Sequence, residues 1–189
     1  MKYLPTYVLG VVFATSVAMN ASAVEYKAIQ PEKSKVTFQY KQMGVAMDGH
    51  FKKFAAQLSF DPSKLAAAKA DIEIDLASID AGSSDADDEV MGKAWFNVKA
   101  FPKATFVAKH IKGTAANQFE VTGTLTLKGK TQDIKFPLKL VTQGATAVFS
   151  GGFVMRRADF AIGEGLWSKF DVVANDIQVN FQLTAIPGK

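Results

Sequence analysis

Histidine and cysteine, which carry much of enzyme chemistry near neutral pH, are scarce in this chain. There are two histidines and no cysteine among 189 residues. His110 lies in phase with Phe106 and Ala108, which predicts a residue of a strand rather than a base. His50 beside Asp48 predicts a turn residue. Because no nucleophile elbow or other catalytic signature accompanies either histidine, the sequence predicts no catalytic residue and a protein that is not an enzyme.

An acidic run, Asp85-Ala86-Asp87-Asp88-Glu89, raises the question of a calcium site. Its spacing lacks the glycine at the sixth position and the late bidentate glutamate of an EF-hand loop. A helix that is capped by Ser84 and runs to about Trp95 accounts for the acids, because the helix dipole favours carboxylates in the first turn. The two histidines show no ligand spacing either. The sequence predicts no metal and no cofactor.

Two adjacent arginines, Arg156 and Arg157, follow an apolar run. Guanidinium groups at a strand end can bind a phosphate or pyrophosphate head group. They can equally be solvated loop charges that pair with Asp159 or Glu164. The sequence leaves both interpretations open.

Alternation of apolar and polar residues dominates the chain and predicts antiparallel strands with one solvated face. Apolar residues occupy every second position in series that start at Val36, Phe54, Ala70, Phe119, Ile134, Ala145 and Ile177, and residues 105–111 add a strand with two partly apolar faces. Lys128-Gly129-Lys130 predicts a hairpin turn, and Asp48-Gly49 a hairpin tip, unless a bulge between Gly49 and Lys53 takes its place. Asp61-Pro62 predicts a second short helix over 63–68. About eight strands leave a sandwich and a closed barrel open.

The N-terminus has the pattern of a secretory signal peptide. Lys2 precedes an apolar run from Leu4 to about Met19, and the small residues Ala21-Ser22-Ala23 follow. We therefore expect residues 1–23 to be cleaved before Val24, and residues 24–189 to form one exported, periplasmic domain without disulfides. The net charge of the whole chain is +4, with the charged residues interspersed rather than clustered. This pattern argues against a nucleic-acid partner.

Several segments, taken in order, resemble the YceI-like family of bacterial polyisoprenoid-binding proteins. They are Gly49-His50-Phe51-Lys52-Lys53-Phe54, Ser78-Ile79-Asp80, Trp95-Phe96-Asn97, Phe101-Pro102-Lys103-Ala104-Thr105-Phe106, Gly123-Thr124-Leu125-Thr126-Leu127-Lys128-Gly129-Lys130-Thr131 and Arg157-Ala158-Asp159-Phe160-Ala161-Ile162-Gly163. The resemblance implies an all-β, lipocalin-like, eight-stranded antiparallel β-barrel with one or two short helices, and an apolar cavity for an isoprenoid chain. The family's Arg-Asp-x-His-Leu run reads Ala86-Asp87-Asp88-Glu89-Val90 here, and Gln42-Met43 replaces a histidine that often precedes Gly44. The resemblance therefore supports tail binding more than a particular head group.

The expected function is the binding or carriage of an isoprenoid lipid, a quinone or a polyprenyl chain, with an inner-membrane protein as a further candidate partner. The alternative is a structural or partner-binding envelope protein with a packed barrel and no lipid. Gly123, Gly151, Gly152, Ala145 and Ala147 are predicted to leave room for a cavity. Arg156 and Arg157 are the candidates for head-group contact, and no oligomeric state is predicted. The predicted cavity lining comprises Phe38, Phe54, Leu58, Ile74, Trp95, Phe96, Phe106, Leu125, Phe136, Phe153, Phe160 and Trp167.

Overall fold

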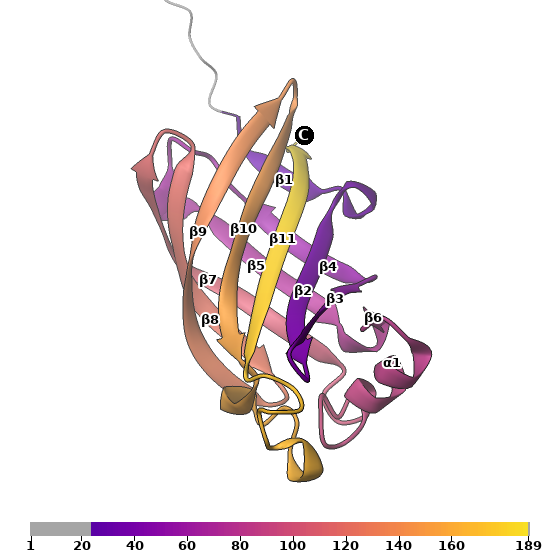
Figure 1. The fold of residues 1–189 in the computed structure, drawn as a ribbon. Coiled ribbons are helices and arrows are strands. Elements are labelled where there is room, and N and C mark those ends of the chain that lie inside the picture. The colour runs from indigo at the N-terminus through magenta and orange to yellow at the C-terminus, as the bar shows by residue number, and fades with distance from the viewer. Residues whose placement is uncertain (1–23, 189) are drawn as a thin grey trace, which may run out of the picture.

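One antiparallel sheet accounts for most of residues 24–188, the part of the chain that the computed structural model describes (Figure 1). The expected signal peptide, residues 1–23, lies outside the described residues. The strands are β1 (Tyr26–Ile29), β2 (Lys35–Gln42), β3 (Val45–Phe51), β4 (Phe54–Ser59), β5 (Lys69–Asp75), β6 (Ile79–Asp80), β7 (Lys103–Ala115), β8 (Gln118–Leu127), β9 (Lys130–Gln143), β10 (Thr146–Arg156) and β11 (Asp176–Pro187). The helices are α1 (Ser84–Met91) and five short 3-10 turns, Pro31–Lys33, Leu65–Ala67, Leu76–Ser78, Arg157–Phe160 and Gly165–Trp167.

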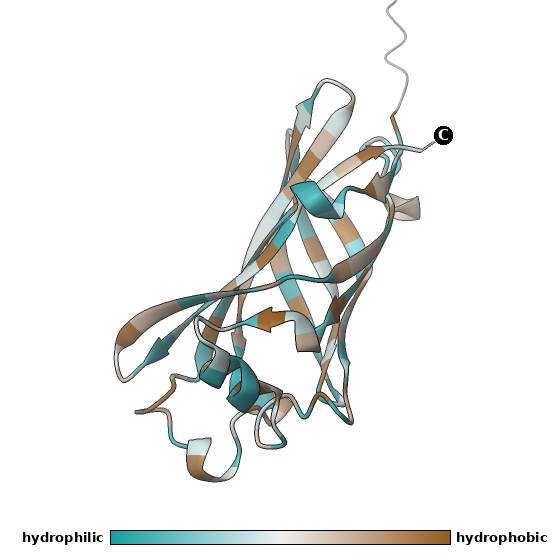
Figure 2. Cartoon of the chain, turned by 90° about the vertical axis from the view of Figure 1, so that its right-hand side faces the viewer, coloured by the Kyte–Doolittle hydropathy of each residue, from teal (hydrophilic) through white to brown (hydrophobic). Residues whose placement is uncertain are grey.

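Residues that alternate between apolar and polar in the sequence also alternate between buried and exposed in the structure. In β8, every second side chain from Phe119 to Leu127 is buried and the residues between them are partly exposed. Figure 2 shows the same mixture of hydrophobic and hydrophilic residues along the other strands, while α1 is largely hydrophilic. Each strand therefore places one apolar face inside the curled sheet, which is the physical basis of the strand predictions.

The sheet curls into a barrel because β3 and β4 are two parts of one bent run. Only Lys52 and Lys53 separate them, and they do not pair with each other. The pairing order is β4-β5-β7-β8-β9-β10-β11-β2-β3-β6, so the bent run has β5 beside one part and β2 beside the other. Counted as one, it gives eight long runs, and the predicted lipocalin-like antiparallel barrel is confirmed. The short β1 pairs with β11 and meets the end of β4, where the backbone N–H of Tyr26 donates to the Phe60 carbonyl over 2.9 Å.

The first hairpin turns at a place that the sequence did not indicate. Met43 and Gly44, with φ of 47° and 81°, form the tip between β2 and β3, and the predicted tip at Asp48-Gly49 is wrong. Gly49 lies inside β3, where the Phe38 ring covers it so closely that a Cβ would overlap the ring. The alternative, a bulge between Gly49 and Lys53, is not found either: β3 pairs with β2 in regular register up to Phe51, and the strand then breaks at Lys52-Lys53. His50 is consequently an exposed strand residue and not a turn residue.

A β-bulge changes the direction of His110. This histidine is in β7, as predicted, but the pairing of β7 with β8 shifts between Ala108 and His110. The extra residue reverses the phase of the strand, so that His110 is exposed and Ile111 packs against the core. The expectation that His110 shares a face with Phe106 is therefore wrong.

Helix α1 begins one residue earlier than the sequence indicated. Its N-cap is Ser83 rather than Ser84: the Ser83 hydroxyl accepts a hydrogen bond from the backbone N–H of Ala86 at 3.3 Å. The helix ends before Gly92, well short of Trp95. The predicted helix over 63–68 is reduced to the 3-10 turn Leu65–Ala67, preceded by a turn in which Asp61 accepts from the backbone N–H of Ser63 at 2.8 Å.

Substitution of the two serines tests directly which of them caps α1. Replacing Ser83 by alanine removes the acceptor for an end N–H of α1, so we expect the free energy of unfolding to fall by about 1 kcal/mol. The Ser84→Ala variant serves as the matched control and should change stability by less than about 0.5 kcal/mol, because its hydroxyl caps nothing. Urea unfolding followed by circular dichroism measures both. An equal loss in the two variants would contradict the assignment of the cap.

Candidate functional site

The interior of the barrel is filled at one end and hollow at the other. At the end that carries β1, Tyr26, Phe60, Phe119 and Phe149 make edge-to-face contacts, with ring centroids 5.0–6.0 Å apart. We call this the packed end. Toward α1, the barrel encloses a cavity of about 610 Å³, within the size range of ligand sites. The end at α1 is the mouth of the cavity.

Nine of the twelve side chains predicted to line a cavity do line it. They are Phe38, Ile74, Trp95, Phe96, Phe106, Leu125, Phe136, Phe153 and Trp167. The remaining three lie elsewhere. Phe54 packs against the cluster of the packed end, Leu58 borders a separate cavity of about 50 Å³, and Phe160 is buried behind the wall with 2% of its surface exposed.

The prediction missed several lining residues that the phase of their strands would have indicated. Val36 and Tyr40 flank Phe38 on β2, Met155 follows Phe153 on β10, and Val179 and Phe181 lie on β11. Their phase was a usable signal, because every second residue of a strand faces the same way. Met47 lines the cavity from β3, opposite Tyr40. Val173 also lines it, but it lies outside the strands and reaches the cavity where the segment before β11 bridges to Gln42.

The glycines and alanines that were predicted to leave room for a ligand do not do so. A Cβ on Gly123 would lie 2.5 Å from atoms of the Phe106 ring, and a Cβ on Gly151 would lie 2.6 Å from the Phe181 ring. Gly152 is covered by the side chain of Asn180. The two alanines do not border the cavity, because Ala147 is fully buried at the packed end and Ala145 is exposed in a turn. The cavity therefore comes from the spacing of large side chains near the mouth.

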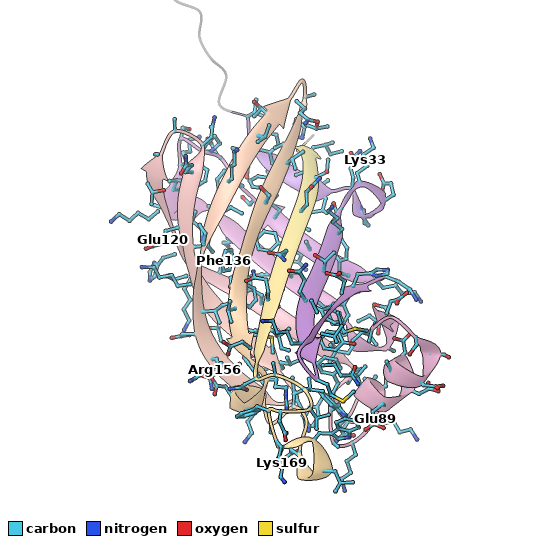
Figure 3. All side chains as sticks on the ribbon, viewed as in Figure 1. Lys33, Glu89, Glu120, Phe136, Arg156 and Lys169 are labelled. Carbon is cyan, nitrogen blue, oxygen red and sulfur yellow. The ribbon has the colours of Figure 1, made fainter. Side chains whose placement is uncertain are left out.

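Polar groups are concentrated at the mouth. Gln42, Ser83, Asp85 and Glu89 border the cavity there, whereas its walls farther in are apolar. In Figure 3, Glu89 lies at the lower end of the molecule and Phe136 about midway along the barrel. This arrangement suits an amphiphile whose polar head stays near α1 and whose apolar part extends toward Phe136.

Three ring side chains at the mouth are held by polar contacts or by each other. The Trp95 indole N–H donates to Glu89 over 3.2 Å, and the Trp95 and Trp167 rings lie 5.4 Å apart. The Tyr40 hydroxyl donates to the Ala81 carbonyl over 3.0 Å. Burial, with a smaller contribution from the negative charge of Asp87, raises the pKa of Tyr40, so its phenol is neutral near pH 7.

The two arginines have different surroundings. Arg156 is exposed and pairs with Asp159 at 2.9 Å, as the surface interpretation expected. Arg157 borders the cavity, with only 1% of its surface exposed, and no carboxylate among residues 24–188 pairs with it. Its guanidinium instead donates to six backbone carbonyls at 2.7–3.3 Å, those of Ile162, Gly163, Trp167, Lys169, Val173 and Ala174. Burial lowers the pKa of Arg157 from its usual value.

The six carbonyls belong to residues 161–174, which we call the mouth loop. A guanidinium has five N–H groups, so these contacts leave none for a lipid head group. Head-group binding by Arg156 or Arg157 stays a prediction, and the structure gives each of them other partners. The mouth loop carries Trp167 and Val173 into the cavity wall.

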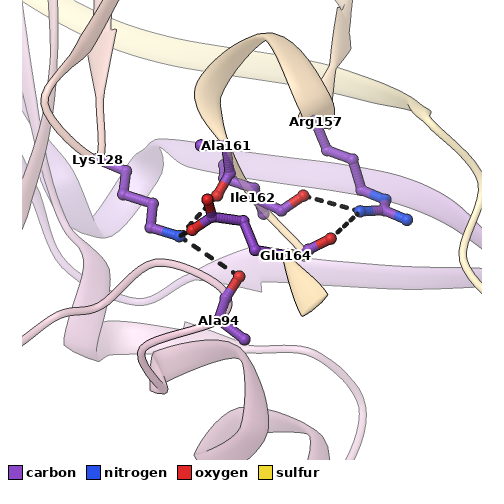
Figure 4. Close-up of polar contacts among 7 residues, drawn as sticks. Ala94, Lys128, Arg157, Ala161, Ile162 and Glu164 are labelled. Carbon is purple, nitrogen blue, oxygen red and sulfur yellow. Dashed lines mark hydrogen bonds and ion pairs between the residues drawn. The ribbon is translucent and has the colours of Figure 1, made fainter. Parts of the chain in front are cut away.

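A second buried cation, Lys128, ties the mouth loop to the segment after α1 (Figure 4). Its ammonium group donates to the Ala161 carbonyl at 2.6 Å, to Glu164 at 2.8 Å and to the Ala94 carbonyl at 3.4 Å. The hydrogen bond and the positive charge of Lys128 hold the pKa of Glu164 below its usual range. Two buried cations thus fix one wall of the mouth.

Within residues 24–188, no group of three or more histidine, aspartate or glutamate side chains is placed to hold a metal ion. Nor is any helix in this range long and apolar enough to cross a membrane. The histidines lie on the outer surface and do not border the cavity. The cavity is therefore bordered by apolar, aromatic and a few polar side chains.

Known proteins share this architecture. A family model for the YceI-like domain matches residues 27–185. Protein YceI of Salmonella agona is 31% identical over 140 residues, which cover 72% of this chain and 73% of that protein. The crystal structure of BcnA from Burkholderia cenocepacia is similar with a TM-score of 0.81 and 42% identity, covering 84% of this chain and 99% of that one. A structure described as a polyisoprenoid binding domain from Saccharophagus degradans is similar with a TM-score of 0.71 and 18% identity, covering 87% and 99% of the two chains.

Proposed function

Since the chain belongs to the family of YceI-like domains, we propose that it is a periplasmic binding or carrier protein for an isoprenoid lipid. The ligand is a quinone or a polyprenyl chain, with its tail in the cavity and its head at the mouth. The observation that carries this proposal is the cavity itself, which is apolar along its length and polar at one end only. The description of the Saccharophagus degradans relative as a polyisoprenoid binding domain supports the ligand class.

The energetics favour an apolar chain as the ligand. Burial of apolar surface contributes about 25 cal/mol for each Å², and an isoprenoid tail exposes several hundred Å² to water. The resulting gain of several kcal/mol grows with the length of the tail and offsets the loss of ligand freedom on binding. Because the walls present few polar groups, the affinity should depend on tail length more than on head group.

The alternative is a structural or partner-binding envelope protein with a filled barrel. The packed end is filled in that manner, but the half near α1 is not, which favours a ligand-binding role. The binding proposal includes no catalytic step. An inner-membrane protein that donates or accepts the lipid is part of the proposal as a partner.

The periplasmic part of the proposal rests on the sequence of residues 1–23. Native mass spectrometry of protein purified without detergent from the periplasm tests location and ligand together. We expect a chain that begins at Val24 and carries an additional mass, which organic extraction identifies as an isoprenoid. A chain with Met1 intact in the cytoplasm would refute export. Ligand-free protein that also fails to take up a long-chain quinone would refute the binding role.

A further inference from the structure

The cavity ends halfway along the barrel at a wall of phenylalanine rings, although apolar space continues beyond it. The main cavity of about 610 Å³ and the small cavity of about 50 Å³ share four lining residues, Ile72, Phe106, Phe136 and Phe181. The two spaces are thus separated by one layer of side chains. Beyond this layer, the small cavity is bordered by apolar residues of the packed end, such as Val121 and Leu138.

Phe136 is the central ring of the wall. Its centroid lies 5.4 Å from that of Phe106, 5.4 Å from that of Phe181 and 5.7 Å from that of Phe153. These rings come from β9, β7, β11 and β10, so the wall extends across the barrel from four strands. Phe136 is 6% exposed and lies about midway along the barrel (Figure 3).

Two glycines fix the rings on either side of Phe136. Phe106 lies over Gly123 and Phe181 lies over Gly151, at distances that leave no space for a Cβ. Any larger residue in place of either glycine would displace the ring above it. These glycines therefore explain how rings from neighbouring strands can reach across the barrel, which is a reason to have glycine inside a strand.

We infer that Phe136 is a specificity-determining residue, a stop that sets the length of the tail that the cavity accepts. This inference rests on the proposed function, because it concerns how that same cavity selects its ligand. A tail that enters at the mouth runs along the apolar wall until it meets the Phe136 ring. Removing the ring joins the main cavity to the small one and admits a longer chain.

The test measures the affinity of two series of alcohols as a function of chain length. The first series consists of prenyl alcohols with increasing numbers of isoprene units, and the second of unbranched alkyl alcohols. Binding is followed by the fluorescence of Trp95 and Trp167, the only tryptophans of the chain, both of which border the cavity. In the wild type, we expect the affinity to rise with length and then to reach a plateau.

In the Phe136→Ala variant, the plateau should move to a chain at least one isoprene unit longer, with at least tenfold tighter binding of that chain than in the wild type. Phe119→Ala is the matched control, because Phe119 is equally buried at 6% but borders neither cavity. It should leave the plateau where it is. If alanine prevents folding, Phe136→Leu and Phe119→Leu form a milder pair with the same expected order.

The outcomes separate this inference from the proposed function. If alkyl alcohols bind with a plateau that shifts in Phe136→Ala while prenyl alcohols do not bind, the isoprenoid function is wrong and the stop is right. If prenyl alcohols bind but the plateau is the same in the wild type and in Phe136→Ala, the function stands and the stop is overturned. Failure of both series to bind the wild type overturns both.

Discussion

The Arg157→Met variant is expected to lose about 3–5 kcal/mol of unfolding free energy, the largest effect on stability that we expect of a side chain at the mouth, because several hydrogen bonds to a charged group are lost and each contributes about 1.5–3 kcal/mol. Methionine fills similar space but donates no hydrogen bond. The six carbonyls that now accept from Arg157 would then face an apolar side chain. A buried polar group without its partner costs about 1–3 kcal/mol, and movement of the mouth loop toward water limits the total.

Arg156→Met provides the matched control for this experiment. Its guanidinium is exposed and makes one surface ion pair, with Asp159, which contributes about 0–1 kcal/mol. Urea unfolding gives the two free energies, and hydrogen exchange shows whether protection is lost over residues 161–174. Arg157→Lys should recover little, because an ammonium group has three donors and no planar fork. Similar losses in Arg156→Met and Arg157→Met would show that the carbonyl contacts do not stabilise the loop.

Filling the cavity from its wall should abolish tight ligand binding while the protein stays folded. Met155 borders the cavity on β10, and its neighbour Val154 points outward with 57% of its surface exposed. We expect Met155→Trp to weaken the binding of a long-chain quinone at least tenfold. The reason is that each methylene kept out of the cavity costs about 0.8 kcal/mol, and about 1.4 kcal/mol corresponds to a factor of ten.

Val154→Trp adds an indole to the same strand outside the barrel and should leave the affinity unchanged. Isothermal titration calorimetry measures both affinities without relying on tryptophan fluorescence. The unfolding free energy of Met155→Trp should change by less than the 1–3 kcal/mol typical of overpacking, because the indole enters an existing cavity. Unchanged affinity in a folded Met155→Trp protein would place the tail outside the barrel and favour the partner-binding alternative.

The strands could be predicted because half-buried strands repeat every two residues, and series such as Phe119 to Leu127 repeat without interruption. The errors occurred where tertiary contacts decide. Gly49 reads as a turn residue, but the Phe38 ring requires a glycine there in the middle of a strand. His110 reads as an inward residue, but the preceding bulge turns it outward.

The part of the candidate site that lies on strands could also be predicted from the two-residue repeat, whereas the part set by tertiary contacts could not. Lining residues such as Phe38 and Phe153 follow from strand phase, and phase alone would also have found Met155 and Val179. The environment of Arg157 could not be inferred, because its six partners are carbonyl groups, which every residue type has. The position of the phenylalanine wall depends on which strands face each other across the barrel, and alternation carries no information about that.

The pairing of β2 with β11 affects how the protein folds as well as what it binds. Gln39 faces Gln178, so the barrel closes through residues about 140 positions apart in the chain, and such non-local pairing slows folding to milliseconds or longer. Until β11 has been synthesised, one edge of β2 has no partner, and an unpaired strand edge can associate with other chains. Since β11 also supplies Val179 and Phe181 to the cavity, a nascent chain has no complete binding site. The order of synthesis therefore determines the earliest moment at which a ligand can be held.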